Sequence, residues 1–350
     1  MKYSFIGNLA HGPVDVVGDV HGEIDALESL LDRLGYGRRG DHPEKRKLVF
    51  VGDLCDRGPD SPAVVARVRD LMARANAQCV LGNHELNILR GSHKSGNRWF
   101  LDPAHPEQQF GGEFAHCASI DGTASDEVLE FFATLPLALE RPDLRIVHAA
   151  WHRQAVDTLR GASGTVLSQY ERYEALTNER IRLEGLREAA MEEEAQWGEQ
   201  LSNKFTTVPM LSATGRLDML YQMGNPVRVL TSGVETIART PFFSSGKWRM
   251  CDRVRWWDEY YERPAVVVGH YWRQLEPISH ADHGASKPAL FPHEAPEDWV
   301  GPARNVFCVD FSVGARYQER QSGASRFSTR LAAMRLPERV LVLSEDQEHR

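Results

Sequence analysis

The amino-acid sequence predicts an α/β fold for this chain of 350 residues. The N-terminal third repeats one pattern three times: a short β-branched run, a polar turn that begins with glycine, and a stretch with helical periodicity. Later apolar runs alternate poorly with polar residues, as is typical of strands buried on both faces. The composition, with 42% hydrophobic and 26% charged residues, is that of an ordinary globular protein. This excludes disorder or a coiled coil over the whole chain.

The first repeat begins with a β-branched run at 14–17 and continues into Gly-Asp-Val-His-Gly at 18–22. A helix is expected next, because apolar residues from Ile24 to Leu34 share one face. Gly35 is the residue type that commonly ends a helix.

The second repeat has an apolar run at 48–51, followed by Gly-Asp-Leu-Cys-Asp-Arg-Gly at 52–58. Ser61 as the cap and Pro62 at the first helical position predict a helix after this turn. The third apolar run, at 79–81, leads into Gly-Asn-His-Glu and another helical start. The N-terminal third is therefore expected to fold as β-α-β-α-β.

Further strands are expected in the rest of the chain, at 145–147, 227–230, 265–268, 306–309 and 340–343. Between 152 and about 201 the sequence has helical periodicity and is rich in Glu and Arg. We expect one domain over 1–350, with a helical cap inserted at about 152–264. The alternative is a solvated surface helix without a role in function.

The charge balance and the cysteines restrict the class of partner and the location. Lys and Arg number 41 and Asp and Glu number 49, which gives a formal net charge of −8. This balance argues against binding of long nucleic acids but permits a small phosphorylated ligand. The five cysteines are far apart, and no stretch is long and apolar enough to span a membrane, so we expect a cytoplasmic protein.

Six polar residues stand directly after apolar runs, where the carboxyl ends of strands gather in an α/β sheet; they are Asp19, His21, Asp53, Asn83, His148 and His270. Carboxylate, amide and imidazole ligands suit Mn²⁺, Fe or Zn²⁺ better than Mg²⁺. Six ligands exceed the needs of one tetrahedral site. If Asp53 bridges two ions, Asp19 and His21 complete one ion site and the other three residues complete the second. This set predicts a two-metal hydrolase.

The three N-terminal motifs resemble the signature of the calcineurin-like metallophosphoesterases. The matching motifs are Asp-x-His, Gly-Asp-x-x-Asp-Arg-Gly and Gly-Asn-His-Glu, all within 18–85, and His148 and His270 match singly. Because Asp-Arg-Gly follows the proposed bridging aspartate, the chain most resembles the branch of this superfamily that contains the phosphoprotein phosphatases and the symmetrical diadenosine tetraphosphatases. The resemblance implies a four-layer α/β/β/α sandwich and two divalent ions, with Mn²⁺ expected first.

Two departures bear on the substrate. Leu81 stands where Ser/Thr protein phosphatases usually have Arg, and His148-Ala149-Ala150 replaces their usual His-Gly-Gly. These departures favour a nucleotide or dinucleoside-polyphosphate hydrolase over a protein phosphatase. A noncatalytic scaffold with the same fold is a third hypothesis. It predicts loss of metal ligands or of His84, and the sequence keeps them all.

The resemblance also implies roles for residues beside the metal ligands. His84 is expected to protonate the leaving oxygen, and Asp56 to hold the His84 ring in the required tautomer. Arg57, whose planar fork matches phosphate geometry, is expected to clamp the phosphate, and Asn83 to contact the substrate as well as a metal ion.

A stretch between 247 and 261 mixes arginines with aromatic residues and leads into the strand before His270. It predicts a surface that stacks a base on Trp256 and holds phosphate through Arg249, a second clamp. The alternative is that the stretch forms the amphipathic underside of the cap.

Overall fold

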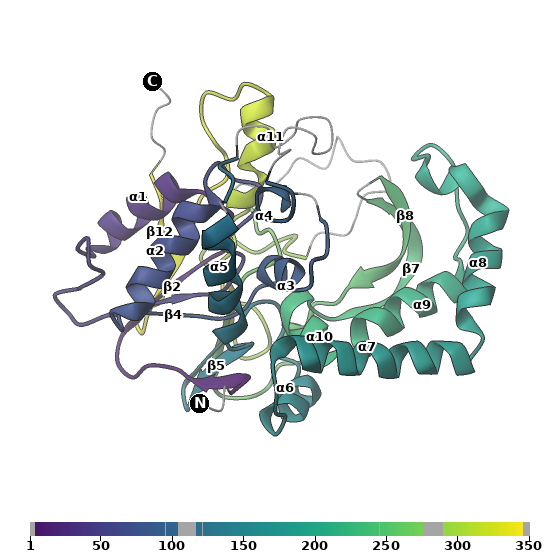
Figure 1. The fold of residues 1–350 in the computed structure, drawn as a ribbon, viewed down its shortest axis with the longest axis horizontal. Helices are drawn as coiled ribbons and strands as arrows, with labels where there is room; N and C mark the ends of the chain where they lie inside the picture. The colour runs from purple at the N-terminus through teal and green to yellow at the C-terminus, as the bar shows by residue number, and fades with distance from the viewer. Residues whose placement is uncertain are drawn as a thin grey trace.

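The structure is a computed structural model that describes residues 4–94, 96–103, 117–120, 122–244, 246–275 and 290–345. Two five-stranded sheets pack face to face, with helices on the outer sides (Figure 1). Helices α1 and α2 contact one sheet, and α6 contacts the edge strand of the other. The predicted α/β class and its four-layer sandwich are confirmed.

The first sheet has the strand order β12-β11-β2-β3-β4. Strands β2, β3 and β4 are parallel, and β11 is antiparallel to both of its neighbours. The bounds of these strands are Val14–Val17 (β2), Lys47–Phe50 (β3), Ala77–Cys79 (β4), Ala332–Leu336 (β11) and Val340–Leu343 (β12).

The second sheet has the order β1-β5-β6-β9-β10. Strands β6, β9 and β10 are parallel, so their carboxyl ends meet at one edge of the sheet. The bounds of these strands are Ile6–Asn8 (β1), Ala138–Arg141 (β5), Leu144–Val147 (β6), Ala265–Val268 (β9) and Val306–Cys308 (β10).

The space between the two sheets is filled by apolar side chains from both. Val16, Val49 and Val80 of the first layer pack in one cluster with Ile146 and Val267 of the second. These strands are buried on both faces, because helices cover the sides that point away from this cluster. Their burial explains why the apolar runs in the sequence do not alternate.

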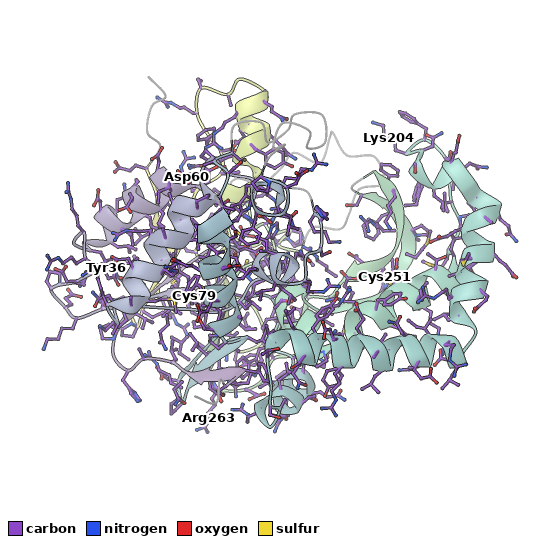
Figure 2. All side chains as sticks on the ribbon, in the orientation of Figure 1. Tyr36, Asp60, Cys79, Lys204, Cys251 and Arg263 are labelled. Atoms are coloured by element: carbon purple, nitrogen blue, oxygen red, sulfur yellow. The ribbon has the colours of Figure 1, made fainter. Side chains whose placement is uncertain are left out.

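Three helices follow the predicted repeats, and they are Ile24–Leu34 (α1), Ser61–Ala73 (α2) and Asn83–Leu89 (α3). Two further helices, which the sequence analysis did not predict, are Arg98–Leu101 (α4) and Gly122–Thr134 (α5). Helix α1 ends at Gly35, which adopts the left-handed conformation as expected. The cap of α2 is a correction: Asp60, which is labelled in Figure 2, accepts the hydrogen bond from the Ala63 amide, and Ser61 does not. The hydroxyl of Ser61 instead accepts from the backbone N–H of Asp56.

Between β6 and β9 the chain forms a group of helices and a hairpin that extends away from the sheets (Figure 1). Small apolar clusters of their own hold α7, α8, α9 and the hairpin together. The bounds are Arg153–Arg160 (α6), Val166–Leu183 (α7), Leu186–Trp197 (α8), Ser212–Met223 (α9), Pro226–Ser232 (α10), Glu235–Ser244 (β7) and Lys247–Arg253 (β8). Short 3₁₀ turns lie at Gly198–Ser202, Trp256–Glu259 and Val313–Ala315, and α11 spans Arg316–Gln321.

The predicted strand at 227–230 is wrong, because these residues lie inside helix α10. The side chain of Asn225 accepts a hydrogen bond from the Val227 amide and so caps the helix, and Pro226 occupies its first turn. The hydroxyl of Thr231 donates to the Val227 carbonyl one turn earlier. Among the residues that the structure describes, no helix has both the length and the apolar character needed to cross a membrane.

Candidate metal centre

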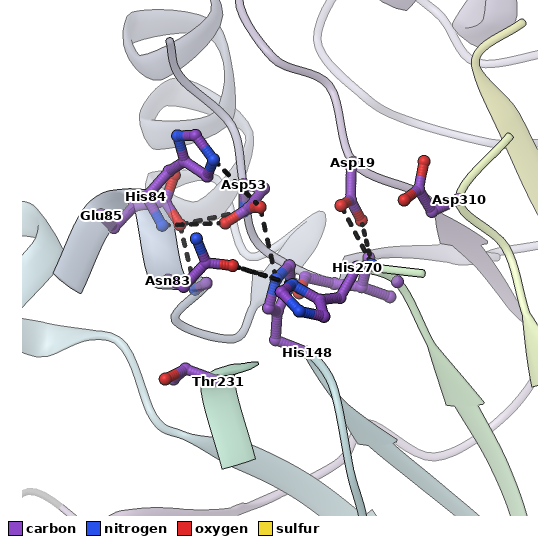
Figure 3. Close-up of polar contacts among 12 residues, drawn as sticks. Asp19, Asp53, Asn83, His84, Glu85, His148, Thr231, His270 and Asp310 are labelled. Carbon is purple, nitrogen blue, oxygen red and sulfur yellow. Dashed lines mark hydrogen bonds and ion pairs between the residues drawn. The ribbon is translucent and has the colours of Figure 1, made fainter. Parts of the chain in front are cut away.

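The six predicted ligands come together at the carboxyl ends of strands from both sheets, and all of them except His21 are labelled in Figure 3. The first sheet supplies Asp19 and His21 after β2, Asp53 after β3, and Asn83 at the start of α3, which follows β4. The second sheet supplies His148 after β6 and His270 after β9. The centre therefore straddles the two layers of the sandwich.

Asp53 lies between two groups of side chains that could each hold an ion, His21 with His84 and His148 with His270. In each group the ligand atoms, those of Asp53 included, lie within 4.8 Å of one another. The Oδ2 atom of Asp53 is 3.3 Å from Nε2 of His148 and 3.8 Å from Nε2 of both His21 and His84. A carboxylate in this position is suited to bridge two ions.

Asn83 and Asp19 contact the second group. The Oδ1 atom of Asn83 is 2.9 Å from Nδ1 of His270 and 3.2 Å from Nε2 of His148. The carboxylate of Asp19 accepts a hydrogen bond from the backbone N–H of His270 at 3.1 Å. These contacts connect the loops after β2, β4, β6 and β9 at one point.

Backbone carbonyls orient two of the histidine rings. Nδ1 of His21 is 3.0 Å from the Cys55 carbonyl oxygen, and Nδ1 of His148 is 2.7 Å from that of Val51. With a divalent ion bound, a ring that donates from Nδ1 would present the lone pair of Nε2, the atom that faces Asp53. Electron-rich nitrogen and oxygen atoms thus converge in a buried space, which fits a site for divalent cations.

Burial and neighbouring charges shift the pKa values of the side chains in this pocket in both directions. Burial alone would raise the pKa of Asp53, but the neighbouring His148 and His84 hold that pKa well below its usual range. Burial would lower the pKa of His148, but the Asp53 carboxylate outweighs it and raises the pKa to about 10. The pKa of the Asp19 carboxyl is raised by burial and by the nearby Asp310.

The backbone that presents these residues adopts unusual conformations. The φ angles are 48° at His21, 49° at Asp53, 74° at Asp56, 72° at Arg57 and 70° at His270. Such left-handed residues other than glycine are uncommon, and they concentrate at functional sites that the surrounding structure holds in place. The strain is local to the loops and leaves the strands regular.

Two glycines allow close approach to the ligands. A Cβ atom on Gly82 would lie 2.2 Å from Oδ1 of Asp53, and a Cβ atom on Gly314 would lie 2.2 Å from Cδ2 of His21. Both distances are far below van der Waals contact, so these positions require glycine.

Glu85 holds the loop after β3 in position, a role that the sequence analysis did not assign. Its buried carboxylate accepts hydrogen bonds from the backbone N–H groups of Gly82, Asp53 and Leu54, at 2.9, 2.9 and 2.7 Å. Glutamate at the third helical position is a known capping signal, and it could have indicated the bond to Gly82. The bonds to Asp53 and Leu54 have no local signature.

His84, the predicted general acid, has the predicted partner. Its Nδ1 atom is 2.5 Å from Oδ2 of Asp56, and both side chains are buried. The other oxygen of Asp56 accepts a hydrogen bond of 2.7 Å from the indole N–H of Trp99. Trp99, in helix α4, therefore fixes the carboxylate that fixes the His84 ring, and the sequence analysis did not single it out.

Replacing Trp99 with phenylalanine removes this N–H donor and keeps an aromatic ring. We expect roughly a tenfold lower kcat on a substrate with a poor leaving group, because the carboxylate loses a hydrogen bond to a charged acceptor. Steady-state rates on an alkyl phosphate measure the effect. Trp299→Phe, which alters an indole packed on Phe307 in the other sheet, is the matched control. An unchanged rate in Trp99→Phe would contradict the role.

Arg57 reaches the centre from the loop after β3. Its Nη1 atom is 3.2 Å from Nε2 of His21, and its guanidinium carbon lies 4.9 Å from the ring centroid of Trp272. The permanently charged, planar guanidinium group at the edge of the candidate ligand cluster is in a suitable position to bind phosphate oxygens.

The aromatic residues predicted to stack a base are mostly packed inside the protein. Trp257 and Tyr260 are buried in the main core, and the indole N–H of Trp256 donates to the Ala149 carbonyl at 3.2 Å. These residues join the hairpin segment to the sheet, which supports the alternative of a packing role. Arg249 lies on β8, and its Nε donates to the Ser244 carbonyl within the hairpin. Its role as a second clamp stays a prediction.

A two-sheet sandwich with histidines, carboxylates and an amide at its strand ends is the arrangement that the resemblance to the metallophosphoesterases implies. A family model described as calcineurin-like phosphoesterase matches residues 12–176. The matched part contains all three motifs and His148. The resemblance drawn from the sequence is confirmed over these residues, which make up slightly less than half of the chain.

Several relatives are bacterial proteins named bis(5'-nucleosyl)-tetraphosphatase PrpE [asymmetrical]. The one from Halalkalibacterium halodurans is 51% identical over 79 residues, which cover 22% of this chain and 32% of the relative. The one from Bacillus velezensis is 31% identical over 141 residues, 39% of this chain and 55% of the relative. The matches thus span less than two thirds of either curated relative.

Among solved structures, one provisionally described as a diadenosine tetraphosphatase aligns over 97% of both chains, with 18% identity and a TM-score of 0.45. A cold-active protein-tyrosine phosphatase of a Shewanella species aligns over 99% of this chain and 83% of its own, with 16% identity and the same TM-score of 0.45.

Proposed function

We propose that this chain is a metal-dependent hydrolase of phosphate esters or anhydrides that acts on nucleotides, and in particular on dinucleoside polyphosphates. The observation that carries the proposal is the position of Asp53 between two groups of ligand atoms, beside the His84–Asp56 pair. The names of the relatives that share the N-terminal motifs support the choice of substrate.

Six residues would hold two divalent ions, Mn²⁺ in the first place or else Fe or Zn²⁺; they are Asp19, His21, Asp53, Asn83, His148 and His270. Bound divalent ions polarise phosphate oxygens and lower the pKa of an attacking water. The remaining steps fall to side chains of this chain.

His84 would donate the proton on Nε2 to the leaving oxygen. Its Nδ1 faces Asp56, so the proton available for transfer sits on the nitrogen that points toward the cluster. Asp56 stabilises the ring as a positioning group and does not itself transfer the proton.

Arg57 would bind the phosphate that reacts, and Asn83 would contact the substrate as well as an ion. Arg249 would act as a second clamp for a longer phosphate chain. The substrate is a small phosphorylated molecule, because the acidic net charge of −8 disfavours a long nucleic acid, and we place the reaction in the cytoplasm.

The region at about 152–264 would act as a cap that selects the substrate. It begins after His148 and ends before His270, so its two ends are anchored beside the candidate metal centre. The Ala149 amide also donates to the Leu230 carbonyl of α10, which ties the cap to the strand end.

A substrate panel with Mn²⁺-loaded protein tests the proposal. The panel contains a dinucleoside tetraphosphate, mononucleotides, a phosphopeptide and phosphorylated nucleic-acid ends, each with and without a chelator. We expect metal-dependent turnover with the highest kcat/KM on the dinucleoside tetraphosphate. Product analysis, two ADP against ATP and AMP, then identifies the anhydride bond that is cut. A preference for the phosphopeptide would indicate a protein phosphatase, and no turnover of any compound would indicate a scaffold.

A further inference from the structure

Trp272 is an exposed aromatic residue at the edge of the candidate metal centre. It lies two residues after His270, and 38% of its surface is exposed. The guanidinium of Arg57 stacks over its ring at 4.9 Å. Trp257 and Tyr260 are buried in the core and Trp256 packs against it, whereas Trp272 presents an aromatic surface next to Arg57.

The backbone of Trp272 is held in an unfavourable conformation by a buried carboxylate. Its φ angle is 50°, a left-handed value that is rare for a bulky side chain. The backbone N–H of Trp272 donates to Oδ2 of Asp310 at 2.9 Å, and the Ser312 amide donates to Oδ1 at 2.8 Å. The Asp310 carbonyl accepts from the Arg273 amide. Such over-determined strain is typical of residues that must present a side chain in one orientation.

Arg273, the next residue, anchors the same loop to the core. Arg273 is 1% exposed, and its guanidinium lies over the rings of Phe307 and Phe311, at 5.0 and 5.6 Å from their centroids. Its Nη2 atom donates to the Asp298 carbonyl at 2.9 Å. Trp272 therefore projects from a rigid support, and its indole loses little freedom when a ligand covers it.

We propose that Trp272 is the platform on which a nucleobase of the substrate stacks, next to the phosphate held by Arg57. The inference rests on the proposed function and assigns the base-recognition residue of the same site. The ring is within contact distance of Arg57, so a phosphate bound to that guanidinium brings its nucleoside to the indole. Stacking of a base on an aromatic side chain changes affinity by roughly 5- to 150-fold on removal of the ring.

A different role for Trp272 would be to hold Arg57 alone. The two roles differ in their dependence on the substrate. A residue that only positions Arg57 affects every phosphate compound alike, whereas a stacking platform affects compounds that carry a base.

The kinetic test compares diadenosine tetraphosphate with inorganic tripolyphosphate, which has the same kind of anhydride bond and no base. In Trp272→Leu we expect kcat/KM on the dinucleotide to fall roughly 5- to 150-fold, mainly through KM, and kcat/KM on tripolyphosphate to stay within about twofold. Trp272→Phe keeps a ring and should retain most of the dinucleotide activity. Equal losses on both compounds, or no loss on either, would overturn the proposal.

Phe205→Leu is the matched control. Phe205 is also an exposed aromatic residue with a cation over its ring, Lys204 at 5.0 Å. Lys204, its neighbour in the chain, lies on the part of the cap far from the sheets (Figure 2). Its replacement should leave both kinetic constants unchanged.

A binding measurement separates this inference from the proposed function. Calorimetric titration with AMP needs no turnover, so it reads base binding even if no substrate of the panel is hydrolysed. We expect the affinity of Trp272→Leu for AMP to fall by the same factor, and the affinity for inorganic phosphate to stay constant. Equal AMP affinities of wild type and Trp272→Leu would refute the platform.

Discussion

Asp53→Asn should lower the metal content from about two ions per chain and reduce turnover by roughly 10³-fold or more. The carboxylate lies between both groups of ligand atoms, so its loss weakens both ion sites at once. Removal of a non-bridging ligand would weaken one site only. Elemental analysis of Mn²⁺-loaded protein and steady-state kinetics on the same samples measure the two effects together.

Asp70→Asn is the control for Asp53→Asn. Asp70 is a carboxylate on the exposed side of α2 that pairs with Arg74, so this variant removes the same charge far from the cluster. Circular dichroism melting in chelator checks that the Asp53→Asn protein is folded. A folded Asp53→Asn protein with full metal content and full activity would contradict the bridging role.

His84→Asn should lower the rate roughly 10² to 10⁴-fold on an alkyl phosphate and much less on p-nitrophenyl phosphate. An alkoxide leaves poorly without a proton, whereas p-nitrophenolate needs little protonation. The pairing of His84 with Asp56 at 2.5 Å is the arrangement that a general acid requires. The ratio of the two rates is the measurement that matters.

His84 also lies in one of the two groups of ligand atoms, so the metal content of His84→Asn decides between two roles. Unchanged metal content with a selective loss on the alkyl phosphate indicates an acid. Reduced metal content with equal losses on both substrates indicates a ligand. His11→Asn, at an exposed position near the N-terminus, is the control and should resemble wild type.

The sequence was sufficient to predict the parts of the fold that local patterns determine. The strand, turn and helix of each N-terminal repeat are encoded within about thirty residues, and the candidate ligands follow the strands directly. The failure at 227–230 has a local cause as well. A short β-branched run fits a strand or a helix, and the capping residues Asn225 and Pro226 decide for the helix.

The residues that the sequence did not reveal act across long separations. Trp99 binds a carboxylate 43 residues earlier, and the amide of Trp272 binds one 38 residues later. No periodicity or motif connects such pairs, because the contact exists only once the sheets have packed. The aromatic stretch at 247–261 shows the converse: its composition resembles a binding surface, but the sheet uses most of it for packing.

The division of the centre between the two sheets has a thermodynamic consequence. Apolar contacts between the layers resist separation of the two sheets. Because these contacts are not directional, they resist sliding of one sheet past the other less strongly. The candidate ligands from both sheets converge at the carboxyl ends of the strands, and an ion bound there would link the two sheets at one point. Ion affinity and the free energy of unfolding are then linked, by about 2.7 kcal/mol when the free ion exceeds its dissociation constant a hundredfold. At low metal concentration we therefore expect a smaller free energy of unfolding as well as a slower reaction.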